Sequence, residues 1–486
     1  MTEHVRQRKL MRSKPLPHIW SVSFQNSGFS PVGERADLAR GMVAEVAVGD
    51  AAVRNDFDEI SIFRRPIFNA TWDSEAGCWK DFVAKGEEGF TYTPTEENRE
   101  VVYRCTPFWY RLEYAADGDP NFFSVSDSPQ EGYRLAPMFR DGATFEYRPC
   151  FEMTVDAAGK PHSRAGAQPM QGTALAVVNT CRNFDSAART ESYTDWFCDL
   201  VLLLVEFATK DLKSVMKGNA NALPLKSALV ESGLDKTGLY IEDTEWVKVG
   251  QSYILYYFFY DTYVSKTVTV LDIDEEYIDG FGHYLTLDID DKEVYDIGNE
   301  CWAVYLCGFA KPTGEALPVV TNASSGVAST ERNAPCVWRG KENPWGNVGS
   351  LIWDMAAALR KDNYFNPCIL DDFANFDGSI NSHYTEYPSI KTFINQSSYL
   401  GKLNSLVEEE PYYFVPITTY NNDRYGWGCR IHLDHPYVTS DVARFLRVGG
   451  SYRTEKGGNH SIWQFLGQSC EDDCFGARLV MKEGLK

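Results

Sequence analysis

The sequence predicts an α+β fold, in which many short strands accompany one apolar core helix. Segments of alternating apolar and polar residues, rich in aromatic side chains, run from about residue 57 to 150 and again through 231–300. Between them, residues 190–217 carry large apolar side chains three and four positions apart, which is the spacing of a buried helix face. A core helix in an otherwise strand-rich chain is the basis of this prediction.

Composition limits the classes of function. The chain has 486 residues and is 44% hydrophobic, as expected for a globular protein of several domains. Its net charge of -21 disfavours both nucleic acid and anionic lipid as partners. The longest apolar helical run, residues 200–205, is far shorter than the roughly 20 residues that cross a bilayer. We therefore expect no nucleic-acid partner and no membrane insertion, and no secretory signal is visible.

Two segments stand out along the chain. Residues 1–50 begin with a basic stretch and continue into a Gly-, Pro- and Ser-rich stretch, which predicts an N-terminal arm or attachment segment. Residues 231–300 contain 17 acidic and four basic side chains, a net charge of -13, in closely spaced strands. We expect a small acidic all-β module at 236–300.

The sequence also predicts where the helices begin and end. Thr190 or Ser192 can cap the first helix, and Gly218 can end it. A second helix is predicted over about 348–362, and residues 151–180 read as a loop because Gly and Pro recur in them.

Three clusters suggest chemistry, and each has a simpler explanation. His432 and His435 flank a carboxylate but lack a third metal ligand at suitable spacing. Cys470 and Cys474 enclose three acidic residues, which would suppress a reactive thiolate. The acidic strands fail the calcium-loop pattern, because His283 stands where its bidentate Glu is required. We therefore expect no catalytic residue, no metal site and no cofactor.

The C-terminal region has the composition of a binding surface. Residues 421–427 and 449–465 mix aromatic side chains with Asn, Ser and Gly. Rigid rings beside small hydrogen-bonding residues are typical of antibody-like recognition loops.

Three short motifs carry a family resemblance: 338–348 (WRGKENPWGNV), 447–452 (RVGGSY) and 476–480 (GARLV). Together they resemble the C-type-lectin-like fold of the formylglycine-generating-enzyme type, although Gly349, Tyr452 and Ala477 replace aromatic residues of that pattern. Upstream stretches such as FWYRLEY resemble bacteriophage tail and structural proteins. The resemblance implies a lectin-like domain built from 51–235 and 301–486, with the acidic all-β module 236–300 as an insertion.

The resemblance also implies a function. Phage receptor-binding proteins and the variable proteins of diversity-generating retroelements display variable side chains just before the terminal strand of this fold. We therefore expect a non-enzymatic tail adhesin of the virion, made in the bacterial host cytoplasm and displayed as a homotrimer. Its partners would be a host cell-surface receptor, glycan or protein, and other virion proteins. The expected ligand-binding residues are Tyr452, Arg453, Asn459, His460, Trp463, Phe465, Tyr420, Asn422 and Tyr425.

Two alternatives remain open at this point. The chain could be a purely structural virion component, such as a head fibre or baseplate part, with residues 1–50 as its attachment segment. It could also be a copper-dependent oxidase of the formylglycine-generating type. That reading is weaker, because no cysteine lies in the expected Tyr-Cys-x-Arg context.

Overall fold

The fold is described from a computed structural model. It describes residues 18–24, 31–114, 120–140, 142–219, 222–224, 238–241, 244, 247–250, 252–259, 262–278, 282–289, 301–307, 310–331, 333–359, 364–387, 392–393, 397–407, 410–420, 430–433, 442–448, 463–466 and 476–483.

The expected α+β class is wrong, because the described chain is predominantly β. Its two α-helices are α2 (Ala174–Phe184) and α3 (Tyr193–Phe207). The segment predicted as a second helix forms strand β23 (Ser350–Leu359) instead. Its Met-Ala-Ala-Ala-Leu run favours a helix by propensity. However, β23 pairs on one side with β24 and on the other with β30, and this tertiary pairing overrides the local preference.

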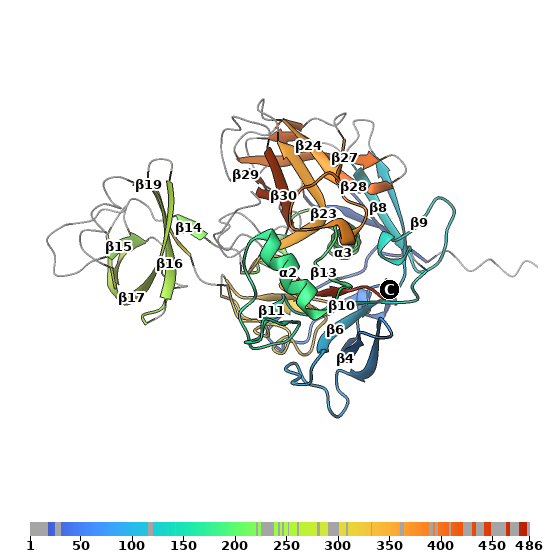
Figure 1. Ribbon diagram of the computed structural model, residues 1–486, viewed down its shortest axis with the longest axis horizontal. Coiled ribbons are helices and arrows are strands. Elements are labelled where there is room, and N and C mark those ends of the chain that lie inside the picture. The colour runs from blue at the N-terminus through green and yellow to red at the C-terminus, as the bar shows by residue number, and fades with distance from the viewer. Residues whose placement is uncertain are drawn as a thin grey trace, which may run out of the picture.

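Helix α3 lies inside the main body (Figure 1). All but one of its residues are buried, as expected for a helix that is apolar on every side. It packs against β1, β8 and β23, and thus lies between two sheets. The sheet on one side has five strands in the order β2 (Glu34–Asp37), β1 (Ile19–Ser23), β8 (Pro120–Ser126), β7 (Trp109–Tyr114) and β9 (Arg134–Leu135).

The sheet that contains β23 has nine strands. They follow the order β25 (Thr385–Glu386), β24 (Tyr364–Ile369), β23, β30 (Val442–Val448), β31 (Trp463–Leu466), β29 (Arg430–Leu433), β27 (Ser397–Val407) and β28 (Glu410–Tyr420), with β26 (Thr392–Phe393) paired to β24. All pairs are antiparallel except β29 with β31.

Smaller sheets complete the body. One contains β10 (Glu146–Pro149), β6 (Arg99–Cys105), β4 (Ile67–Asp73) and β5 (Cys78–Ala84). Another contains β22 (Lys341–Glu342), β21 (Cys336–Trp338), β20 (Ser325–Val327) and β3 (Ala47–Val48). Two-stranded pairs are β11 (Thr154–Val155) with β12 (Pro161–His162), and β13 (Ala188–Arg189) with β32 (Val480–Met481). Short 3₁₀ turns are η1 (Asp56–Glu59), η2 (Pro137–Phe139), η3 (Leu212–Ser214) and η4 (Phe373–Asn375).

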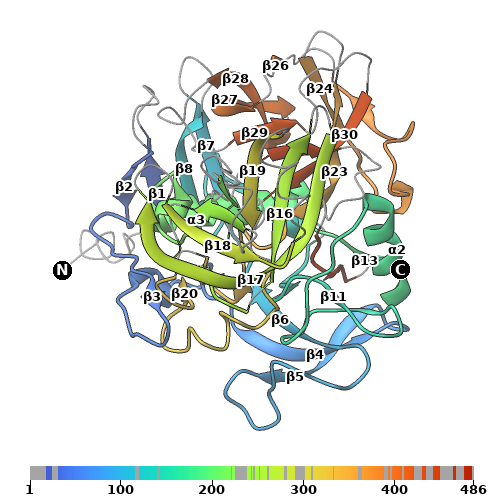
Figure 2. The ribbon, with the colours of Figure 1, turned by 90° about the vertical axis from the view of Figure 1, so that its left-hand side faces the viewer.

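A six-stranded sheet forms a separate lobe (Figure 1), which lies in front of the main body in the view of Figure 2. Its strands are β14 (Ala222–Pro224), β19 (Cys301–Cys307), β16 (Ser252–Phe259), β17 (Thr262–Ile278), β18 (Gly282–Leu287) and β15 (Gly238–Ile241). It has its own apolar core, in which Leu255, Val268 and Leu285 are completely buried. An exposed ion pair between Lys248 Nζ and Glu331 Oε1, at 3.3 Å, links it to the body.

The segment 1–50 does not behave as a detached arm over its described residues. Trp20 and Val22 of β1 are buried in the main core, and β1 pairs with both β2 and β8. Alternation within the short stretch Ile-Trp-Ser-Val-Ser is a strand signal. Residues 18–24 and 31–50 are therefore part of the main body.

The predicted first helix forms, but it is shorter than expected. Ser192 caps α3, and its side chain and that of Asp195 accept hydrogen bonds from each other's backbone N–H groups in a capping box. The helix ends at Ala208, ten residues before Gly218, because Ala208 adopts a left-handed conformation with φ of 50°. Helix α2 begins within 151–180, the segment predicted as a loop, and extends four residues beyond it; Thr173 accepts the capping hydrogen bond.

The cap of α3 is the first point to test. Replacing Ser192 with Ala removes the acceptor of the Asp195 N–H, which lies 3.2 Å away, and we expect a loss of about 1 kcal/mol in the free energy of unfolding. Urea unfolding measures this loss. The exposed Ser186→Ala variant is the control and should unfold like the wild type; equal effects of the two substitutions would contradict the capping role.

Candidate functional site

Most of the predicted ligand-binding residues lie outside the described residues. These are Asn422, Tyr425, Tyr452, Arg453, Asn459 and His460. Tyr420 is the last residue of β28, and Trp463 and Phe465 belong to β31. Of the predicted surface, the structure thus describes the strands that border it.

The strand register gathers the ends of four strands. Tyr399 of β27 pairs with both Tyr420, where β28 ends, and Arg430, where β29 begins. Trp463, where β31 begins, pairs with the residue that follows Arg430, and β30 ends beside it. Five adjacent strands at about 5 Å spacing extend over about 20 Å. Both predicted segments, 421–427 and 449–465, thus attach to the sheet along one line of this width.

Two of the sequence motifs meet in the core beneath this sheet. The Arg478 guanidinium donates to the carbonyl oxygens of Cys150, Glu342 and Asn343. Gly346 has a φ of +78°, and a Cβ there would lie 2.9 Å from the backbone of Asn219, so the position requires glycine. These motif residues hold strands and loops together rather than lining an open site.

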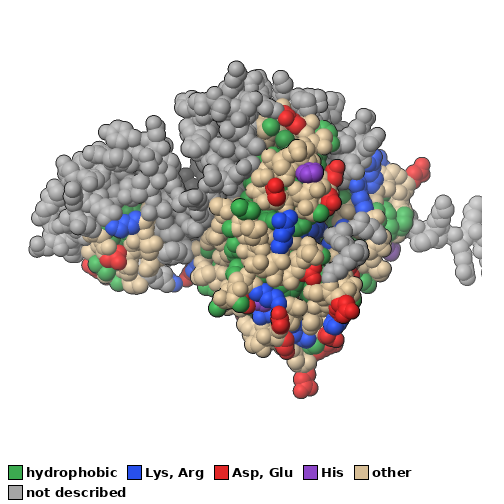
Figure 3. All heavy atoms as spheres, viewed as in Figure 1, with side chains coloured by type: hydrophobic (Ala, Val, Ile, Leu, Met, Phe, Trp, Pro, Cys, Tyr) green, Lys and Arg blue, Asp and Glu red, His purple; other side chains and the backbone are tan. Residues whose placement is uncertain are grey.

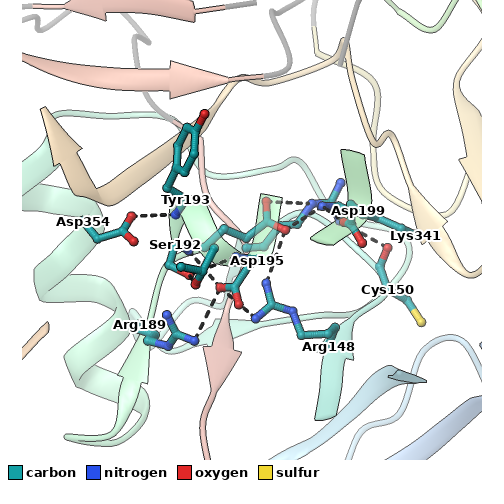
Figure 4. Close-up of polar contacts among 12 residues, drawn as sticks. Arg148, Cys150, Arg189, Ser192, Tyr193, Asp195, Asp199, Lys341 and Asp354 are labelled. Atoms are coloured by element: carbon teal, nitrogen blue, oxygen red, sulfur yellow. Dashed lines mark hydrogen bonds and ion pairs between the residues drawn. The ribbon is translucent and has the colours of Figure 1, made fainter. Parts of the chain in front are cut away.

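A network of buried charges surrounds the first half of α3 (Figure 4). Lys341 Nζ donates to Glu191 Oε1 at 2.6 Å and to Asp199 Oδ2 at 2.9 Å. Asp195 forms ion pairs with Arg148 at 2.9 Å and with Arg189 at 3.4 Å. All of these side chains are buried; Asp195 and Asp199 lie on α3, and the others come from strands and loops around the helix.

A second group of buried charges lies near the C-terminal end of α3. Glu206 is 0% exposed. Its carboxylate accepts two hydrogen bonds from Arg339, at 2.7 and 2.8 Å, one from Trp338 Nε1 at 2.9 Å and one from Asn55 at 2.7 Å. Arg339 and Glu206 thus form a bidentate ion pair, with one N–H group donating to each carboxylate oxygen, which is among the strongest forms of ion pair in proteins.

Two of these carboxylates, Glu191 and Glu206, are held ionised. Burial raises the pKa of Glu191, but Lys341 and the neighbouring arginines outweigh burial and bring the pKa below its usual value. Burial also raises the pKa of Glu206, and its hydrogen bonds and the Arg339 charge again outweigh it. A carboxylate that is fully paired and inaccessible to substrate is a structural anchor rather than a general base.

Three other buried acidic groups have raised rather than lowered pKa values. Burial raises the pKa of Glu146, Glu152 and Asp354 to about 7 in each case. All three are at least nine-tenths buried, and Asp354 accepts a hydrogen bond from the Tyr193 backbone N–H at 2.6 Å. They lie in the protein interior, where they affect stability.

The clusters that suggested metal or thiol chemistry are placed only in part. Cys470, Cys474 and His435 lie outside the described residues, and His432 belongs to strand β29. Among the residues that the structure describes, no group of three or more His, Cys, Asp or Glu side chains could hold a metal ion.

The buried carboxylates on α3 and just before it form a structural feature that was not predicted from the sequence. Glu191, Asp195 and Asp199 recur every four positions, and Glu206 follows seven positions later on the same apolar segment. Acidic residues at helical spacing within a fully buried helix are the signal that could have revealed the network.

The comparisons with known proteins leave the family undetermined. No protein-family model matches the chain, and no curated protein matches it significantly. In the described part of the chain, no helix combines the length and the apolarity needed to span a membrane. On the face shown in Figure 3, described Lys, Arg, Asp and Glu side chains are interspersed rather than gathered in one broad patch of a single sign.

The Arg339–Glu206 pair gives a test of the network. Replacing Arg339 with Met leaves a fully buried carboxylate without its counter-ion, and we expect a loss of about 3–5 kcal/mol in the free energy of unfolding. Chemical unfolding monitored by tryptophan fluorescence measures the loss. Arg54→Met, which breaks an exposed pair with Asp56, is the matched control and should have a much smaller effect. Similar losses in both variants would contradict the proposed anchoring.

The raised pKa of Asp354 gives a pH prediction. Between about pH 4, where an aspartate in the unfolded chain ionises, and its folded pKa of about 7, the folded protein retains a proton that the unfolded chain has lost. Stability from this group is therefore present at low pH and is lost as the pH rises through about 7. Asp354→Asn keeps an acceptor for the Tyr193 N–H and cannot ionise, so the variant should gain stability relative to the wild type between pH 5 and pH 8.

Urea unfolding at these two pH values tests the Asp354 prediction. The exposed Asp371→Asn variant is the control and should show no such relative gain. A constant difference between wild type and Asp354→Asn across the pH range would contradict the assigned protonation.

Proposed function

We propose that this protein is a receptor-binding protein of a bacteriophage virion. In this proposal, the segments 421–427 and 449–465 together present one ligand-binding surface, and the chain has no catalytic role. The main support for this proposal is the strand register. β28 and β30 end, and β29 and β31 begin, along one line of a single sheet, so both segments attach to the sheet along that line. Two loops with recognition-type composition are more useful for binding when they lie side by side.

The scaffold under these segments suits such a role. β23, an interior strand of the same sheet, is tied to α3 by the hydrogen bond from the Tyr193 backbone N–H to Asp354. It is also tied to the C-terminal segment by hydrogen bonds between Gly476 and its neighbours Gly349 and Leu351. Binding residues are commonly carried by loops that a rigid framework positions. Side chains that are already positioned lose less entropy on binding, so weak contacts contribute more to affinity.

The partners follow from this role. The receptor would be a glycan or a protein on the bacterial surface, and other virion proteins would hold the chain in the particle. Display as a homotrimer would turn several weak sites into one avid contact.

The proposal is tested by host-cell binding. The triple variant Tyr452→Ala, Asn459→Ala and His460→Ala changes the proposed surface without altering any described strand. Labelled wild-type protein should bind cells of the bacterium on which the virus propagates, and flow cytometry should show that the triple variant binds at least about tenfold less.

A control separates receptor binding from general stickiness. Tyr277 is an exposed aromatic residue of β17, 49% exposed, in the separate lobe. Tyr277→Ala should bind cells like the wild type. Unchanged binding by a correctly folded triple variant, or an equal loss in Tyr277→Ala, would refute the proposed surface.

A further inference from the structure

The separate lobe carries two exposed aliphatic side chains that are neighbours in space. Val249 is 56% exposed and Leu271 is 53% exposed. The backbone N–H of Gly250 donates to the carbonyl oxygen of Val270 at 2.7 Å, which brings the residues next to them in sequence together. Leu271 belongs to β17, which faces the viewer in Figure 2, on the side of the lobe away from the main body. Adjacent exposed apolar side chains with a polar surround are typical of interaction surfaces.

Acidic side chains continue this surface along β17. Asp272, Glu275 and Glu276 are exposed. No ion pair joins Glu275 or Glu276 to another residue that the structure describes. We call Val249, Leu271, Asp272, Glu275 and Glu276 the lobe face. It combines apolar surface with negative charge, and a partner that is both apolar and basic would complement it.

A segment of that chemistry is present in the same chain. Residues 1–17 contain five basic side chains and one acidic side chain, a net charge of +4. Lys and Arg are therefore five of 17 residues there, against 47 of 486 in the whole chain. Val5, Leu10 and Met11 add apolar side chains to the same segment. The lobe, in contrast, belongs to the part of the sequence with a net charge of -13, residues 231–300.

The position of β1 indicates which copy of the chain the basic segment can reach. Residues 1–17 lie outside the described residues and precede β1, which pairs with β8. In Figure 1, β8 lies on the side of the main body opposite to the lobe. The main body thus separates β1 from the lobe of its own chain, whereas the lobe of a second copy can approach β1 freely. We propose that residues 1–17 of one copy bind the lobe face of a second copy.

This contact joins two different surfaces of the chain. It leaves a lobe face free on one copy and a basic segment free on the other. Further copies can therefore add head to tail until a ring closes or a filament forms. The contact is independent of the proposed receptor-binding surface, because neither side of it includes residues 421–427 or 449–465.

Sedimentation velocity on the full chain at low salt tests the contact. The wild type should form assemblies of more than one copy, and added salt should dissociate them because it screens exposed charges. The segment variant, Arg6→Glu with Arg8→Glu and Lys9→Glu, should associate at least about tenfold more weakly, and so should the lobe variant, Glu275→Lys with Glu276→Lys.

Mixing these two variants identifies the surfaces that meet. The segment variant keeps an intact lobe face, and the lobe variant keeps an intact basic segment. An equimolar mixture should therefore form a two-copy complex, although neither variant associates well alone. A segment that bound the lobe of its own chain would not produce this complex.

Matched variants control for overall charge and for general stickiness. Glu88→Lys with Glu131→Lys makes the same change of charge at exposed positions of the main body and should associate like the wild type. Leu271→Ser should weaken association, whereas Leu175→Ser, at a position on α2 that is 50% exposed, should not. Circular dichroism confirms that each variant is folded.

Three results would overturn the proposal. The first is a wild type that stays a single copy at low salt at every concentration tested. The second is a mixture of the segment and lobe variants that forms no complex. The third is an equal loss of association in the lobe variant and in the Glu88→Lys, Glu131→Lys control, because overall charge and not the lobe face would then govern association.

Discussion

The carboxylates on and beside one buried helix are stable only when they pair with cationic side chains, and the rest of the main body supplies those side chains. Asp195, Asp199 and Glu206 lie on α3, which has almost no exposed surface. An unpaired charge in such a place is very costly, because it loses its hydration and gains nothing in return. The partners come from segments that are distant in sequence, such as Arg65, Arg148, Arg339 and Lys341. Pairing can therefore be complete only when these segments are all in place.

This requirement links distant parts of the chain. The hairpin formed by β21 and β22 supplies Arg339 and Lys341 to opposite ends of α3, and the C-terminal segment supplies Arg478 beside it. Asp354 accepts a hydrogen bond from the first helical N–H of α3 and so ties the helix to β23, an interior strand of the nine-stranded sheet. Replacing a whole buried ion pair with apolar residues often leaves net stability unchanged, whereas removing one partner is strongly destabilising. A fixed arrangement is what a sheet needs if loops at its edge are to be held in constant positions.

The same network explains how cationic side chains can line a cavity in an acidic protein. Arg339 pairs with Glu206 in the core and with Asp58, which lines the cavity. The Arg65 side chain pairs with Asp199 and is 2% exposed. The core carboxylates stabilise these guanidinium groups without occupying the cavity. Net charge describes the surface as a whole, whereas the charge at any one place depends on the few groups there.

The sequence by itself determined the features that depend on neighbours along the chain. Apolar spacing and the Ser192 cap predicted the core helix, and alternation predicted strands in 57–150 and 231–300, because both periodicities are local properties. The fold class, the strand at 350–359 and the burial of Trp20 and Val22 depend on tertiary contacts, because β pairing joins residues far apart in sequence. The same holds for the candidate sites: composition singled out Tyr420 and Trp463, but only the register brings their strands together. Nothing in the local sequence around Val249 or Leu271 indicates that the two are neighbours, because only the fold of the lobe brings them together.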